Sequence, residues 1–65
     1  MSFVSYRYHV IIDSRLYSSR VFKVTKEEFQ RRLSAYMEIS DIDRIEAFYN
    51  SHLYVWYRAC GWSMK

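Results

Sequence analysis

Two short runs of alternating side chains lie near the ends of the chain, and they limit the fold more than any other feature. The first run extends from Tyr6 to Ile12, and the second from Leu53 to Ala59. A period of two residues is the pattern of a strand whose two faces meet different surroundings. In both runs even the more polar face carries Tyr, Trp, His or Arg, which protein interfaces favour. The runs therefore predict strands of a sheet that has a binding face.

The chain has 65 residues, which predicts a single domain, residues 1–65. A domain of this size buries only about 60% of the surface of its unfolded chain, so its stability is marginal. Cys60 is the only cysteine, which excludes an internal disulfide, and together with His9 and His52 it lacks the spacing of a zinc site. We therefore expect no metal and no cofactor. Aromatic burial and assembly into a homodimer are the remaining ways to gain stability.

The net charge is +3, and the longest run of basic residues is Arg31-Arg32. Nucleic-acid-binding domains usually cluster their charge more strongly, so this balance favours a solvated surface over an anionic partner. The first residues lack a basic segment followed by an apolar core, and no apolar stretch approaches the length of about 18 residues that spans a membrane. One free cysteine fits a reducing compartment. We expect a cytoplasmic protein with no membrane partner.

Residues 5–12 and 17–24 are predicted to form two antiparallel strands joined by a turn at Asp13-Ser14-Arg15. The helix that follows has the clearest start signal in the chain. Thr25 and Glu28 have the spacing of a capping box, and Val24 and Phe29 that of a hydrophobic staple. The helix is predicted over residues 26–38, and the apolar stripe that packs on the sheet consists of Phe29, Leu33, Tyr36 and Met37.

Residues 39–52 allow two interpretations. Ser40 to Asp43 could cap a second helix, or residues 44–49 could form a strand that ends in a tight turn at Asn50-Ser51. The alternating run at 53–59 favours the hairpin. The predicted fold class is therefore α+β, with a small antiparallel sheet and one helix packed on one of its faces, in the order ββαββ.

Catalysis has little support in the sequence. Asp41 and Asp43 flank Ile42 in a segment where acidic residues usually serve as caps, and no Ser, Cys or Asp near the histidines suggests a nucleophile triad. Gly61 is the only glycine, so the chain has no glycine-rich phosphate loop. We expect no catalytic residues and no enzyme activity.

One short helix covers one side of the sheet, so the other side is the predicted binding face. Its partner-binding residues are expected to be Tyr54, Trp56 and Arg58, with Leu53, Val55, Tyr57 and Ala59 in the core under the helix. Beside them we expect Tyr8, His9 and Arg7. The plainer interpretation is that these rings only complete the packing of a small protein. An alternative function is a small basic nucleic-acid-binding module, in which bases stack on Tyr54 and Trp56 while Arg7, Lys23 and Arg58 neutralise phosphates.

The hairpin, the helix that begins after Thr25, the segment Ile45–Phe48 and the closing Ala59-Cys60-Gly61 resemble small bacteriophage-encoded inhibitor proteins, in particular Dmd-type phage antitoxins. The resemblance rests on layout and carries over no functional residue. It implies a non-enzymatic phage protein in the host cytoplasm that binds a bacterial toxin or defence protein and blocks it by surface occlusion. Small anti-CRISPR proteins have the same size and mode of action. The basic charge argues against mimicry of nucleic acid.

Overall fold

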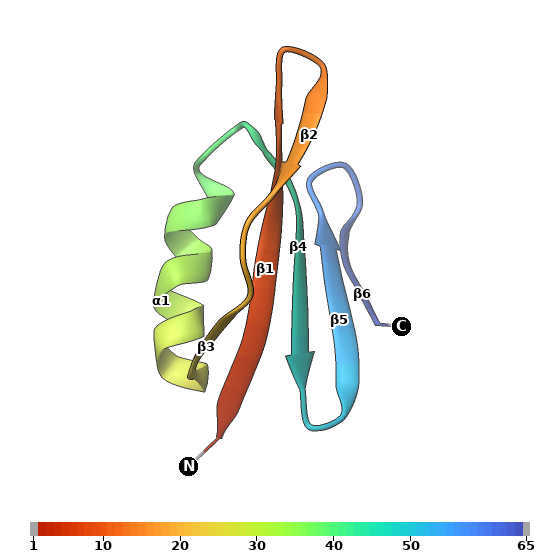
Figure 1. Ribbon diagram of the computed structural model, residues 1–65. Coiled ribbons are helices and arrows are strands. Elements are labelled where there is room, and N and C mark those ends of the chain that lie inside the picture. Colours follow the sequence, from red (N-terminus) through yellow and green to blue (C-terminus); the bar gives the residue numbers. More distant parts are fainter. Residues whose placement is uncertain (1, 65) are drawn as a thin grey trace.

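In the computed structural model, which describes residues 2–64, one helix lies against one face of a six-stranded antiparallel sheet (Figure 1). This confirms the α+β class. The elements are β1 (Phe3–Ile12), β2 (Arg15–Ser18), β3 (Phe22–Thr25), α1 (Lys26–Met37), β4 (Ile42–Tyr49), β5 (His52–Tyr57) and β6 (Gly61–Met64). The predicted order ββαββ is wrong, because three strands precede the helix and three follow it.

The long strand β1 organises the sheet. One of its edges pairs with β2 and β3 in succession, its other edge pairs with β4, and β5 and β6 continue the sheet beyond β4. The predicted strand 17–24 is therefore two strands. The Ser19 hydroxyl accepts a hydrogen bond from the Tyr8 N–H at 3.0 Å and donates one to the Arg20 carbonyl at 2.8 Å. A side chain thus replaces a backbone acceptor at the point where the ladder is interrupted.

Two tight turns set the registers of the hairpins. Asp13 and Ser14 have φ values of 52° and 63°, and Asn50 and Ser51 have values of 51° and 63°. Two consecutive left-handed residues form the turn that matches the twist of paired strands. The hairpin interpretation of residues 39–52 is therefore confirmed. A third reversal, which ends at Gly61 with a φ of 83°, leads into β6, a strand that the sequence analysis does not predict.

The helix begins where the capping box places it. The Thr25 hydroxyl accepts a hydrogen bond from the Glu28 N–H at 3.2 Å, and α1 ends at Met37, one residue earlier than predicted. The predicted stripe on α1 packs on the sheet against a buried cluster that consists of Val4, Tyr6, Phe29, Ile42, Ile45, Ala47 and Trp56. The apolar period of the helix therefore identified the correct face.

Polar atoms within this contact are paired with one another. The hydroxyls of Tyr6 and Tyr36 are 2.8 Å apart, and Arg32 Nη1 donates a hydrogen bond to the Tyr6 hydroxyl at 3.0 Å. Burial, followed by the hydrogen bond with Tyr6, raises the pKa of Tyr36 to about 12. The network ties β1 to the second half of α1 without leaving the buried Tyr6 hydroxyl unsatisfied.

Replacing Thr25 with Ala should lower the free energy of unfolding by about 0.5–2 kcal/mol, because the first turn of α1 loses its side-chain acceptor. Ser34→Ala, at an exposed position in the middle of the helix, is the control and should change stability little. Chemical denaturation followed by circular dichroism measures both variants. Equal midpoints for Thr25→Ala and the unmodified protein would show that this cap does not stabilise the helix.

Candidate functional site, an apolar groove beside the helix

The structure reverses the predicted orientation of β5. Trp56 pairs with Ile45, which pairs with Tyr8, and paired residues share one face of a sheet. This is the face on which α1 lies, and Trp56 is only 8% exposed within the core. Tyr54 lies on the same face. The prediction that Tyr54 and Trp56 point away from the helix is therefore wrong. Leu53, Val55 and Tyr57 do not lie beneath the helix, and Ala59 is exposed in the turn after β5.

Arg58 holds the connection between α1 and β4. Its Nε donates to the Ile42 carbonyl at 2.8 Å, its Nη2 to the Ile39 carbonyl at 2.7 Å, and its Nη1 to the Met37 carbonyl at 3.2 Å. The last turn of α1 contains no basic residue, so Arg58 supplies the cation that suits a helix C-terminus. Its guanidinium also lies 5.0 Å from the centroid of the Trp56 ring. These contacts give Arg58 a role inside the molecule.

The other predicted residues divide between the two faces. Tyr8 lies on the helix side, where its ring centroid is 5.1 Å from that of Tyr36. Arg7 and His9 lie on the opposite face, as predicted, and both contact Glu46. The six predicted partner-binding residues therefore do not form one surface. Tyr54 and Trp56 lie with Tyr8 on the helix side, whereas Arg7 and His9 lie on the opposite face, because alternate side chains of a strand point to opposite faces.

His9 is a buried link between three strands. Its Nε2 lies 2.6 Å from Glu46 Oε1 on β4, and its Nδ1 lies 2.7 Å from the Ser18 hydroxyl on β2. Arg7 Nε donates to the same Glu46 oxygen at 2.9 Å. The hydrogen bond with His9, and then that with Arg7, lowers the pKa of Glu46. With the ring 3% exposed and both of its nitrogens hydrogen-bonded, this cluster stabilises the sheet.

An apolar groove is present where the helix does not cover the sheet. Helix α1 lies over β1 and β3, whereas β5 and β6 lie beyond β4 and are not covered by the helix (Figure 1). The groove between α1 and this uncovered part has a volume of about 240 Å³. Its lining residues come from the helix and from four strands, and they are Val4, Lys26, Phe29, Gln30, Leu33, Ala47, Tyr49, Tyr54 and Trp62.

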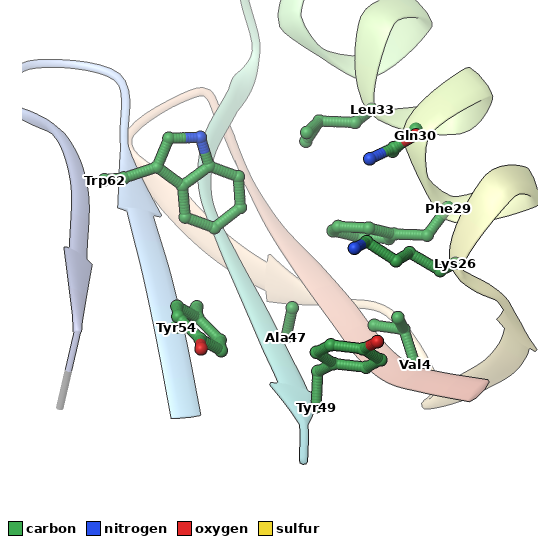
Figure 2. A pocket seen from close by; sticks show the side chains of 9 residues that line it. All are labelled: Val4, Lys26, Phe29, Gln30, Leu33, Ala47, Tyr49, Tyr54 and Trp62. Atoms are coloured by element: carbon green, nitrogen blue, oxygen red, sulfur yellow. The ribbon is translucent and has the colours of Figure 1, made fainter. Parts of the chain in front are cut away.

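Trp62 forms the outer wall of this groove. Figure 2 shows its indole and Tyr54 on one side, Phe29 and Leu33 of α1 on the other, and Ala47 between them. Trp62 pairs with the buried Trp56 across β5 and β6, yet it is 46% exposed. Trp62 is not among the predicted site residues, because the last predicted strand ends before Gly61. The position of Trp62 directly after the only glycine was the one sequence feature that could have indicated a turn followed by a further strand.

The groove offers apolar contact with one cation at its rim. Lys26 is the only charged residue in the lining, and its Nζ lies 5.4 Å from the centroid of the Tyr49 ring. Among the described residues, no group of three or more His, Cys, Asp or Glu side chains is placed to hold a metal ion. No helix in the same part of the chain is long and apolar enough to cross a membrane. The apolar lining of the groove suits the binding of an apolar group.

Replacing Trp56 with Ala should cost about 3–5 kcal/mol of stability, because it leaves a cavity in the core. That loss is a large part of the total for a small domain. Tyr57→Ala, on the opposite face of the same strand, should cost clearly less. Thermal unfolding of the two variants makes the comparison, and a larger loss for Tyr57→Ala would contradict the observed orientation of β5.

Acid should weaken the fold in part through Glu46. A carboxylate with a lowered pKa contributes stability above its ordinary pKa of 4.5, and this contribution is lost as the pH falls through the folded value. Glu46→Gln should therefore show a smaller loss of stability than the unmodified protein between about pH 5 and pH 2. Glu27→Gln, in the exposed first turn of α1, is the control. Parallel pH profiles for the unmodified protein and Glu46→Gln would contradict this role.

Comparisons with known proteins give no relative for this arrangement. No protein-family model, no curated protein and no solved structure matches the chain. The interpretation of the site therefore rests on its geometry and chemistry.

Proposed function

We propose that this chain is a non-enzymatic, phage-encoded protein that binds a bacterial host or defence protein, such as a toxin or a CRISPR-type effector, and inhibits it by covering part of its surface. The observation that carries the proposal is the half-exposed Trp62 beside an apolar groove. Tryptophan is enriched among the few residues that supply most of the energy of protein interfaces. The contact surface is the groove, with Trp62 as its principal anchor.

The size of the groove favours a protein partner over a small molecule. Pockets that enclose small ligands usually measure about 300–1,000 Å³, and they bury most of the ligand surface. A volume of about 240 Å³ in a partly open groove suits one or two side chains that project from a larger partner. Protein interfaces commonly bind such anchoring side chains in preformed pockets.

The walls of the groove are held in place by the fold. Phe29 is buried in the core, and Ala47 lies beneath the groove on the central strand β4. Trp62 is exposed, but the pairing of β6 with β5 fixes the strand that carries it. A site built on regular elements loses little conformational entropy on binding, so more of the contact energy appears as affinity.

The nucleic-acid alternative loses three of the five residues on which it depended. Trp56 is too buried to stack on a base, Arg7 is paired with Glu46, and Arg58 donates to backbone carbonyls. Two of the cations expected to neutralise phosphates are therefore already engaged within the protein. The geometry favours the protein-binding proposal.

The partner can be identified by capture from a bacterial lysate with the tagged protein, with and without nuclease. Trp62→Ala and Phe48→Ala form a matched pair, because the two aromatic side chains are 46% and 51% exposed on opposite faces of the sheet. A protein that is captured by the unmodified chain and by Phe48→Ala, but not by Trp62→Ala, is the expected result. Loss of capture after nuclease treatment would contradict direct protein binding.

The captured protein then allows a direct measurement of affinity by calorimetry. Removing a true anchor costs at least about 2 kcal/mol, which is about 30-fold in Kd, and we expect a loss of this size for Trp62→Ala. Phe48→Ala should remain within a few-fold of the unmodified protein. Circular dichroism should be unchanged in both variants. If Phe48→Ala loses more affinity than Trp62→Ala, the binding face is the one opposite the helix.

A further inference from the structure

Strand β2 forms an open edge of the sheet. Within residues 2–64 it pairs only with β1, and all four of its residues are exposed. Natural edge strands usually carry several charges, a proline or a covering segment, which prevent pairing with another chain. Between Arg15 and Ser18 there is one charged residue and no proline. The short length of β2 limits its pairing with another chain, but β2 has only this one charge, no proline and no segment that covers it.

The backbone groups that face this edge can be identified from the ladder. The Ser19 N–H donates to the Tyr8 carbonyl at 2.9 Å, and bonded and non-bonded pairs alternate along antiparallel strands. Tyr17 is therefore bonded to β1, whereas the N–H and C=O groups of Leu16 and Ser18 point outward. The Ile11 N–H, on the residue opposite Leu16, accordingly turns away from β2 and donates to the Asp41 carbonyl at 2.9 Å.

The edge is held rigidly and is flanked by apolar side chains. The hydrogen bond between the Ser18 hydroxyl and the buried His9 fixes the end of β2 on β1. Leu16 is 55% exposed and Tyr17 is 49% exposed, on opposite faces of the hairpin. Ile11 and Ile12 on the facing strand are also exposed. A preformed edge with apolar groups on both faces pays a small entropic cost on pairing.

We propose that β2 pairs with β2 of a second copy of this chain, antiparallel about a two-fold axis, with Tyr17 opposite Tyr17 of that copy. In this register Leu16 lies opposite Ser18 of the second copy, so every outward backbone group of both residues gains a partner. The two tyrosines meet as a close cross-strand pair, which favours aromatic residues.

The charges favour a second copy as the occupant. In this register Arg15 lies opposite Ser19 of the second copy, so the only charge on β2 is not set against itself. Arg15 is instead a diagonal neighbour of the second Tyr17, within reach of a cation–π contact. A two-fold contact needs one surface that complements itself, and β2 meets this condition. Because the contact is small, we expect a reversible, concentration-dependent dimer.

Sedimentation over about a hundredfold range of concentration should show a monomer–dimer equilibrium. Leu16→Pro should abolish it, because proline removes an outward N–H that β1 does not use. Trp62→Ala should leave it unchanged, since the groove lies elsewhere. A strictly monomeric protein, a dimer that survives Leu16→Pro, or one lost in Trp62→Ala would each overturn the proposal. Circular dichroism establishes that both variants remain folded, and Leu16→Lys replaces Leu16→Pro if the proline variant unfolds.

Cross-linking tests the register directly in a Cys60→Ser background. A cysteine at position 17 should form an intermolecular disulfide, because directly opposite non-bonded residues have Cα atoms about 4.5 Å apart, a distance that suits this bond. Leu16→Cys is the matched control. Position 16 of the second copy is a diagonal neighbour of position 16, and their Cα atoms are farther apart than a disulfide usually spans. Efficient cross-linking of Tyr17→Cys over Leu16→Cys supports the proposal. The reverse preference, or none, overturns the register.

Discussion

A single twelve-residue helix has to cover the apolar face of a six-stranded sheet, and this mismatch shapes the rest of the molecule. The helix lies over β1 and β3 and buries Phe29 against the centre of the sheet. In the described part of the chain, no second helix lies above β5 and β6. Large aromatic side chains such as Tyr54 and Trp62 therefore cover part of the helix-side face of these strands. The part that remains uncovered is the groove. The candidate site is a consequence of incomplete coverage.

Local chemistry made the helix predictable from the sequence. Thr25 and Glu28 are three positions apart, so the cap and its partner can be identified without knowledge of the rest of the fold. The apolar residues that begin at Phe29 recur with the period of a helix, so they identify the face of the helix that is buried. The turn at Asn50-Ser51 is equally local. Each of these features depends on residues that are close in sequence, and each is present as predicted.

The orientation of β5 could not be derived in the same way. Alternation separates the residues of a strand into two sets, but it does not say which set lies under the helix. Trp56 and Tyr57 are both large and aromatic, so neither set is plainly polar. The choice depends on the register of β4, through the pairing of Trp56 with Ile45. Arg58 was similarly ambiguous, because the carbonyls that it binds lie sixteen to twenty-one positions away. The sequence therefore predicted most of the elements around the candidate site but placed Tyr54 and Trp56 on the wrong face of the sheet.

The central position of β4 has a consequence for how the chain reaches this structure. Arg7 and Glu46, which face each other across β1 and β4, are separated by 39 positions, and the whole helix lies between them. Bringing such distant segments together costs loop-closure entropy before the contacts between the strands can offset it, and this cost slows folding. During synthesis, the edge of β1 that pairs with β4 has no partner until β4 has been made. The N-terminal hairpin and the helix alone lack β4, which supplies Ile42, Ile45 and Ala47 to the core, so we expect these segments not to fold stably before β4 has joined β1.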